Sequence, residues 1–301
     1  MKRILYFDCV AGISGDMTLG ALLHLGADID RLRAELDKLG VSGFSLVPGK
    51  AQMNGITGVS LDVRIDGARV EETREHAHEH GGADHSHDGN HAHDHGHAHT
   101  HGHTHDHGHG HTHEAPQTET PNAARAEEPE RSFRDIRALI ENSALNDNVK
   151  RLSIAIFTVI AEAEAAVHDI PTENVVFHEV GALDSIVDIV GAAVCVDMLG
   201  ADEVLCSPVH DGSGFIRCRH GMIPVPVPAV MEMLKGSGIR IVGEDVPTEM
   251  VTPTGFGILK GLGARCTRLP ELRVEGVGYG FGKRDTGRFN ALRVILGELK
   301  N

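Results

Sequence analysis

The 301-residue sequence contains no tryptophan and only two tyrosines, so aromatic residues make up just 4% of it. Basic residues are also few: 28 Lys and Arg stand against 43 Asp and Glu, and the formal net charge is −15. Such a chain offers neither a cationic surface for a phosphate backbone nor aromatic platforms on which bases stack. We therefore expect no nucleic acid as a partner.

Long apolar runs and paired cysteines are missing as well. The longest apolar candidate, residues 152–167, is interrupted by Glu162 and Glu164 and stays below the roughly 18 residues that a membrane helix needs. The five cysteines are odd in number and form no C-x-x-C pair, which favours free thiols over disulfides. The chain also turns acidic at Asp8, too early for a secretory signal. These features predict a cytoplasmic protein with no membrane partner.

Residues 71–131 lack every large apolar residue. They contain no Val, Ile, Leu, Met, Phe, Tyr, Trp or Cys, yet they hold 17 of the 22 histidines. Such a segment buries too little apolar surface to offset its loss of conformational entropy, so we expect a disordered insert. It separates a first α/β unit, residues 1–70, from a second, residues 132–301, that packs with the first.

The insert has the composition of a metal-binding segment. Every second residue from His91 to His113 is histidine, and imidazole is a ligand that suits nickel, copper and zinc. A flexible chain can wrap several imidazoles around one ion, which indicates a reservoir or delivery arm; the alternative is a purely solvating linker. The predicted metal ligands are His91, His93, His95, His97, His99, His101, His103, His105, His107, His109, His111 and His113.

Outside the insert, strand-like and helix-like patterns alternate. The apolar run 2–7 predicts a buried strand, and the alternation at 59–65 predicts a half-buried one. Helical periodicity covers 147–168 and 184–199, and the second of these is apolar enough to be central. The predicted class is α/β (α+β), with a mixed sheet and packed helices.

A first candidate site follows the first strand. Gly12, Ser14 and Gly15 lie between that strand and the next helix, where backbone N–H groups and the helix dipole favour an anion. Asp8 and Asp16 border this loop and could hold a metal ion or a ribose. The alternative is a tight turn in which Asp16 caps the helix.

A second candidate site occupies residues 177–188. Asp184 and Asp188 are four residues apart, so they share one face of a strongly apolar helix. His178 and Glu179 lie just before that helix and could converge on the same place, with His178 as a metal ligand. Such a set suits a divalent ion or a general acid/base pair. The alternative gives Asp184 a capping role and Asp188 an arginine partner.

Histidines also flank a predicted hairpin. Residues 209–211 and 215–218 surround a Gly-Ser-Gly turn, which predicts two paired strands with His210 beside the turn and His220 near it. Both imidazoles could complete a metal or substrate site, and His210 is a candidate metal ligand. A lone hairpin histidine is more often a surface residue.

Two further segments suit a phosphorylated ligand. One is a helix start in which a threonine cap is followed by Pro253, and the other is a glycine-rich stretch, 276–282, predicted to be a mobile loop bearing two cations. The alternatives are an ordinary helix start and a flexible hairpin. The candidate substrate-binding residues here are Thr252, Thr254, Gly255, Lys283 and Arg284.

Several of these motifs, in their order along the chain, resemble a known family. Residues 5–9 (LYFDC), 12–19 (GISGDMTL), 177–191 (FHEVGALDSIVDIVG), 224–228 (PVPVP), 252–255 (TPTG), 278–285 (GYGFGKRD) and 290–298 (NALRVILGE) are similar to those of the nickel insertion proteins of the nickel-pincer nucleotide pathway, the LarC family. The similarity covers almost all of residues 1–70 and 132–299.

The resemblance implies a cytoplasmic nickel chelatase. Its substrates would be Ni(II) and a thiolated pyridinium mononucleotide, pyridinium-3,5-bisthiocarboxylic acid mononucleotide, and its product the cofactor of lactate racemase-type enzymes. It also implies a C-terminal domain that binds CTP with a divalent metal; this sequence does not contain it, so we expect CTP to act through a separate C-terminal polypeptide. Self-association is left open. The alternatives are a nickel-storing metallochaperone without chemistry and a metal-dependent nucleotide hydrolase using Asp8 and Asp16.

Overall fold

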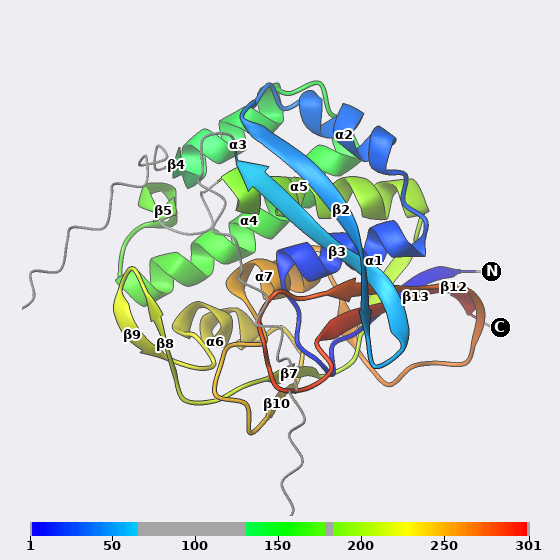
Figure 1. Ribbon diagram of the computed structural model, residues 1–301. Coiled ribbons are helices and arrows are strands. Elements are labelled where there is room, and N and C mark those ends of the chain that lie inside the picture. Colours follow the sequence, from blue (N-terminus) through cyan, green and yellow to red (C-terminus); the bar gives the residue numbers. More distant parts are fainter. Residues whose placement is uncertain (1, 66–130, 178–182, 300–301) are drawn as a thin grey trace, which may run out of the picture. The chain divides into compact units, whose positions relative to one another are not determined.

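The computed structural model describes residues 2–65, 131–177 and 183–299. The predicted insert, except its last residue, Arg131, and the candidate ligands His178 and Glu179 lie outside the described residues. In the described part, the helices are α1 (Gly15–Leu25), α2 (Ile29–Asp37), α3 (Phe133–Asn142), α4 (Asp147–His168), α5 (Leu183–Leu199), α6 (Pro228–Leu234) and α7 (Pro253–Gly261), with a 3-10 turn at Thr172–Asn174 (Figure 1).

A mixed sheet of seven strands runs in the order β11-β6-β1-β13-β12-β3-β2. Its strands are β1 (Arg3–Asp8), β2 (Phe44–Met53), β3 (Ile56–Ile65), β6 (Glu203–Cys206), β11 (Arg265–Cys266), β12 (Leu272–Phe281) and β13 (Ala291–Leu299). β1 pairs in parallel with β6 and antiparallel with β13, so strands from both sides of the insert form one sheet. The predicted α/β class with a mixed sheet is confirmed.

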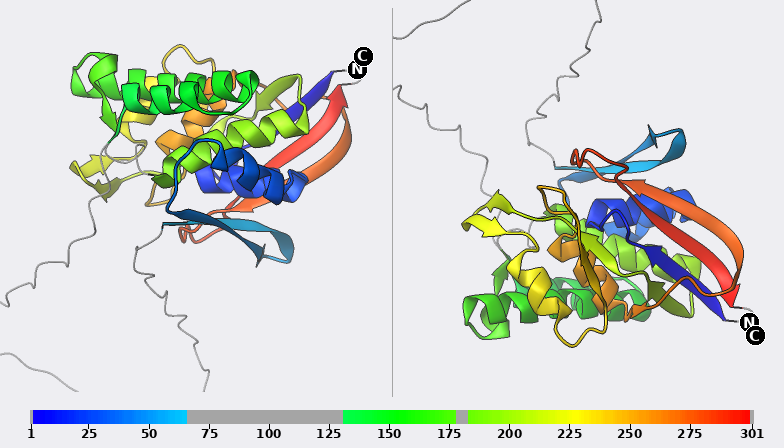
Figure 2. Two further views of the ribbon diagram at one scale, coloured as in Figure 1. Left: turned by 90° about the horizontal axis from the view of Figure 1, so that it is seen from above. Right: turned by 90° about the horizontal axis from the view of Figure 1, so that it is seen from below.

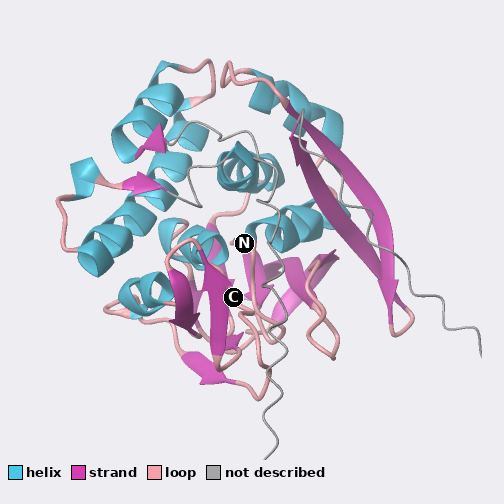
Figure 3. Cartoon of the chain, turned by 60° about the vertical axis from the view of Figure 1, so that its left-hand side comes forward, coloured by secondary structure: helices cyan, strands magenta, loops and turns pink. Residues whose placement is uncertain are grey.

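Helices cover the sheet in layers. In Figure 2, helices α1 and α5 lie between α4 and the strands β1, β12 and β13. α5 contacts α1, α2, α4 and α7, and most of its residues are buried, which explains its nearly uniform apolar sequence. Figure 3 shows the long β2–β3 hairpin standing at one edge, where a single register pair, Gly280 with Val59, joins it to β12.

The predicted mobile glycine loop is wrong. Gly276, Gly278 and Gly280 belong to strand β12, and α1 packs directly on them. A Cβ atom on Gly280 would lie 1.9 Å from the carbonyl oxygen of Met17, so only glycine admits this backbone approach. The close packing fixes the N-terminus of α1 beside Lys283, which follows the end of β12.

The hairpin predicted around Gly212–Gly214 is also wrong. β7 (Val209–Asp211) pairs in parallel with β10 (Ile241–Gly243), and β8 (Phe215–Cys218) pairs with β9 (Gly221–Pro224) instead. The two-residue turn therefore lies at 219–220. A short pair of β4 (Arg131–Ser132) and β5 (Val176–Phe177) completes the described strands. Within this part of the chain, no helix is both long and apolar enough to cross a membrane.

Candidate functional site

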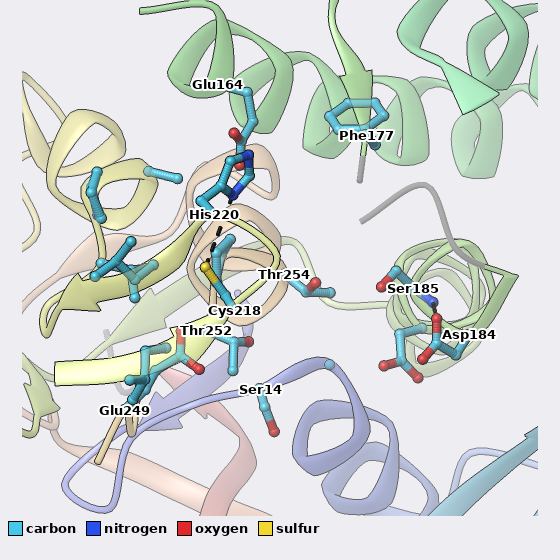
Figure 4. A pocket seen from close by; sticks show the side chains of 18 of the residues that line it. Ser14, Glu164, Phe177, Asp184, Ser185, Cys218, His220, Glu249, Thr252 and Thr254 are labelled. Carbon is cyan, nitrogen blue, oxygen red and sulfur yellow. Dashed lines mark hydrogen bonds between the residues drawn. The ribbon is translucent and has the colours of Figure 1, made fainter. Parts of the chain in front are cut away.

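A cavity of about 730 Å³ opens where α1, α5 and α7 begin. Its wall includes the first residues of these helices, the β8–β9 hairpin, the end of α4 and the segment after β12. Figure 4 shows the side chains that line it, with Ser14 and Thr252 near one another and Asp184 on a separate wall. The volume lies within the range of about 300–1,000 Å³ that is usual for small-molecule sites.

The N-termini of α1 and α7 are held side by side by backbone contacts. The N–H of Ile13 donates to the carbonyl of Met250 at 2.9 Å, and the N–H of Thr252 donates to the carbonyl of Ile13 at 3.0 Å. The predicted cap of α7 is confirmed, because the Thr252 hydroxyl accepts from the N–H of Gly255 at 3.1 Å and Pro253 begins the helix. Two positive dipole ends therefore face one cavity.

Asp211 fixes the chain that leads into α7. Its Oδ1 accepts from the backbone N–H groups of Gly212 at 2.8 Å, Met250 at 2.8 Å and Val251 at 3.0 Å. Burial raises the pKa of this carboxyl in spite of the three hydrogen bonds, which favour the charged form. This positioning role is not evident from the sequence, since nothing near Asp211 in the chain shows which loop its side chain meets.

Three carboxylates from two helices gather at the cavity. Asp184 and Asp188 of α5 line it together with Asp16 of α1, so the predicted shared helix face is confirmed. Asp188 Oδ1 is shielded from solvent and has no hydrogen-bond partner in the described chain. Burial, and then the negative charges of Asp16 and Asp184, hold the pKa of Asp188 well above its usual value.

The start of α1 is fitted closely around this carboxylate. A Cβ atom on Gly15 would lie 2.4 Å from Asp188 Oδ2, so glycine is needed for the two elements to meet. Ser14 caps the helix, and its hydroxyl donates to Asp16, whose Oδ1 also accepts from the N–H of Met17 at 2.9 Å. The alternative role of Asp16 in the helix cap is thus present as well, and Asp16 still lines the cavity.

Two cations lie at the same cavity. Lys283 Nζ donates to Asp62 Oδ1 at 2.9 Å. Burial lowers the pKa of Lys283, but the bond to Asp62 and the charges of Asp16 and Asp188 outweigh it, so the pKa is raised and the ammonium form is favoured. Arg284 Nη1 donates to the carbonyl and to Oε2 of Glu249, at 3.0 and 2.5 Å.

Several predicted site residues lie elsewhere or serve packing. The Asp8 carboxylate pairs with Arg293, whose Nε donates to Asp8 Oδ2 at 2.9 Å, and Asp8 is not part of the cavity wall. Gly12 and Gly255 are also absent from the wall, because the backbones of Met250 and Ile13 fill the space where their Cβ atoms would be. Their predicted ligand contacts, and the role of Asp8, stay predictions.

His210 is separate from the cavity as well. Its Nδ1 lies 2.7 Å from Glu244 Oε1, and Arg288 contacts the other oxygen of Glu244 at 2.9 Å. By contrast, His220 lines the cavity, together with three side chains that the sequence analysis missed: Glu164, His168 and Cys218. The spacing of Cys218 and His220, two residues apart, could have indicated a metal-binding pair, but the predicted hairpin placed its turn at 212–214 instead of 219–220.

Comparison with known proteins confirms the resemblance seen in the motifs. The family model described as nickel insertion protein matches residues 5–301. The chain is 46% identical over 298 residues to a protein of Acetivibrio thermocellus, covering 99% of this chain and 61% of that protein. It is 48% identical over 300 residues to a protein of Lactiplantibacillus plantarum, covering 99% and 62%.

Both relatives are named pyridinium-3,5-bisthiocarboxylic acid mononucleotide nickel insertion protein. A putative nickel insertion protein of Dictyoglomus thermophilum is 36% identical over 297 residues, covering 99% of this chain and 61% of its own length. This chain thus spans about three fifths of the length of these curated relatives. No solved structure matches it. The family match over residues 5–301 and the near-complete coverage by these relatives place the chain in the nickel insertion protein family.

Proposed function

We propose that this chain inserts Ni(II) into pyridinium-3,5-bisthiocarboxylic acid mononucleotide and so forms the nickel-pincer cofactor of lactate racemase-type enzymes. The observation that carries the proposal is the convergence of two helix N-termini, Lys283 and Asp188 on one cavity of about 730 Å³, with one Asp188 oxygen that has no hydrogen-bond partner among the described residues. A phosphate group suits the helix ends and the ammonium group, while a divalent cation suits the carboxylates.

The substrate phosphate would dock at the N-termini of α1 and α7. The groups that support this are Ser14, Thr252 and Thr254, which line the cavity at those helix ends, and Lys283, whose ammonium group carries the matching charge. Arg284 also lines the cavity but is committed to Glu249, so it would act by releasing that carboxylate when an anion enters.

The nickel ion would be neutralised by Asp16, Asp184 and Asp188 as it meets the substrate. Carboxylate oxygens are hard ligands, whereas the two thiocarboxylate sulfurs of the substrate are soft and suit nickel better. Stepwise exchange from oxygen to sulfur would therefore move the ion onto the substrate without a redox step. Each carboxyl group must be deprotonated to bind the ion, so loading releases any proton that Asp188 holds.

Two features of the account lie outside the described cavity. We propose that the histidine tract, His91–His113, collects nickel for delivery, and that CTP with a divalent metal acts through a separate C-terminal polypeptide.

A cytoplasmic location is supported by the five cysteines, all of which are free. A nickel store without chemistry would bind the ion but leave the thiolated nucleotide unchanged.

The carboxylates provide the test. Replacing Asp184→Asn together with Asp188→Asn keeps the side-chain shapes but removes two charges from the nickel path. We expect nickel-containing product, measured by mass spectrometry, to fall below detection while circular dichroism shows an intact fold. The control is Asp197→Asn on the same helix, where the Asp197 carboxylate accepts hydrogen bonds from the side chains of Asn146 and Asn148 and lies outside the cavity wall. Full product formation by the double variant would refute the proposed carboxylate role.

A further inference from the structure

We propose that Cys218 and His220 form the docking pair that receives Ni(II) at the cavity before the ion passes to the substrate. The inference rests on the proposed function and names the protein groups that first hold the nickel. Figure 4 shows the pair on the β8–β9 hairpin, on a different wall from Asp184. The cavity thus has a sulfur–nitrogen wall and a carboxylate wall.

The hairpin geometry presents both side chains to the same space. Cys218 is paired with Gly221, which leaves Arg219 and His220 as the two-residue turn, and Gly221 has the positive φ of 91° that closes it. Along β8, Ile216 and Cys218 are half-buried, while Phe215 and Arg217 are exposed. Cys218 and His220 both belong to the cavity wall.

The separation of the two donor atoms suits one shared ion. Cys218 Sγ lies 3.9 Å from His220 Nδ1. A metal ion bound at about 2.3 Å from a sulfur and about 2.0 Å from an imidazole nitrogen, as is usual for zinc, spans that gap with a bent S–metal–N angle. A weak thiol–imidazole hydrogen bond is the alternative use of the same geometry.

The pair leaves most of the coordination shell open. In the described part of the chain, no three Cys, His, Asp or Glu side chains are already placed to hold an ion together. Structural metal sites are closed by four protein ligands, whereas a site that exchanges ligands keeps positions open. Two protein ligands with water in the other positions therefore suit a cargo that must leave.

Helix α4 supports the pair from one side. The rings of His168 and His220 lie 5.0 Å apart between centroids, and His168 Nε2 lies 3.4 Å from Glu164 Oε2. Figure 4 shows Glu164 extending from α4 towards His220. The ring of His168, itself paired with Glu164, thus packs against the ring of His220 and limits its orientations. As the ion binds, the Cys218 thiol loses its proton to water and the S–Ni bond forms with no change in oxidation state.

The chemistry of the pair selects the metal. Thiolate and imidazole favour nickel, copper and zinc over magnesium and calcium, which prefer oxygen ligands. An ion that arrives from an imidazole-rich segment would meet a similar ligand set at the cavity, and would then be exposed to substrate sulfurs. The nickel would thus pass from imidazoles to the thiolate–imidazole pair and then, with the carboxylates offsetting its charge, to the two sulfurs of the substrate.

A thiolate-specific signal separates this pair from the histidine tract. Nickel bound to thiolate gives a near-ultraviolet charge-transfer band, and residues 71–131 contain no cysteine that could produce one. We expect the full chain, titrated with NiCl₂ to saturation, to develop this band, and Cys218→Ser to lose it completely. The matched control is Cys266→Ser, which removes the other partly exposed thiol and should keep the band.

A second variant tests the imidazole. His220→Asn should retain the band but move its midpoint to nickel concentrations about tenfold higher or more, since even supporting groups of a metal site contribute about 10–100-fold in affinity. A band that persists in Cys218→Ser, or is absent from the unaltered chain, would overturn the proposal. If the band is absent while product still forms, the proposed docking pair is wrong and the proposed nickel insertion stands. If the band appears but no product forms, the docking pair stands and the proposed nickel insertion is wrong.

Discussion

Replacing Asp188 with asparagine should make the protein more stable and less active at the same time. The carboxylate has one oxygen, Oδ1, that is shielded from solvent and lacks a hydrogen-bond partner in the described chain. The negative charges of Asp16 and Asp184 further raise the pKa of Asp188, and the positive charge of Lys283 lowers it only in part. Asparagine keeps the shape, removes the charge and adds a donor.

The magnitude follows from the buried charge. Asparagine leaves a polar atom in the same place but removes the charge, and a buried charged group without a partner costs more than the about 1–3 kcal/mol of a neutral one, so we expect the free energy of unfolding to rise by about 1–3 kcal/mol. For a folded part of this size, each 1 kcal/mol corresponds to about 2–4 °C in melting temperature. Sites that are strained for function commonly show this exchange of stability for activity.

The pH dependence has a definite sign. The folded-state pKa of Asp188 is raised above the ordinary value of 3.8. Between the two values the folded state holds a proton that the unfolded state has lost, so this carboxyl makes stability fall as pH rises from about 4 up to the folded pKa. The stability gain of Asp188→Asn should therefore grow over that window and then level off.

Chemical denaturation at several pH values, followed by circular dichroism, provides the assay. Asp197→Asn on the same helix is the control; it removes a surface carboxylate that already accepts two hydrogen bonds, so it should give no gain in stability. A destabilised Asp188→Asn variant, or a stability difference that does not change with pH, would refute the reasoning about the shifted pKa.

Three further perturbations address other parts of the account. Lys283→Gln should raise KM for the phosphorylated substrate more than it lowers kcat, as measured by steady-state kinetics. Unchanged constants would show that Lys283 does not bind the phosphate. Gly280→Ala should destabilise by about 1–3 kcal/mol or more, because its Cβ would meet the Met17 carbonyl at 1.9 Å, whereas Gly243→Ala, with open space around it, should be neutral in denaturation. Deleting 76–113 should lower bound nickel in equilibrium dialysis and leave the fold; unchanged stoichiometry would contradict the reservoir role.

Local patterns predicted much of the fold. Helix α4 begins and ends where the periodicity indicated, and the apolar run 2–7 forms most of the buried strand β1. The central position of α5 also followed from its apolar sequence. These features depend on residues close together in the chain. The expectation of nickel and a thiolated nucleotide came from the resemblance to a family.

Long-range pairing explains what was missed. The Gly-Ser-Gly segment looks like a hairpin turn, but β7 pairs with β10, about thirty residues later, and local sequence carries no information on that partner. Glycines 276–280 look mobile in isolation and are instead contact points for α1. The same limit affected the site. Asp16 and Asp188 belonged to two separate candidate sites, which the structure brings to one cavity, whereas Asp8, predicted beside Asp16, pairs with Arg293 near the other end of the chain.

The measurement that tests the central claim most directly is conversion of the thiolated nucleotide itself. The full chain would be incubated with NiCl₂ and pyridinium-3,5-bisthiocarboxylic acid mononucleotide, with and without CTP, Mg²⁺ and the C-terminal region of a longer relative supplied in trans, and the products read by mass spectrometry. The account predicts a species whose mass rises by one nickel ion less the protons displaced, dependent on Asp184 and Asp188. Nickel that stays on the protein under every condition, with the nucleotide unchanged, would contradict insertion and leave a store.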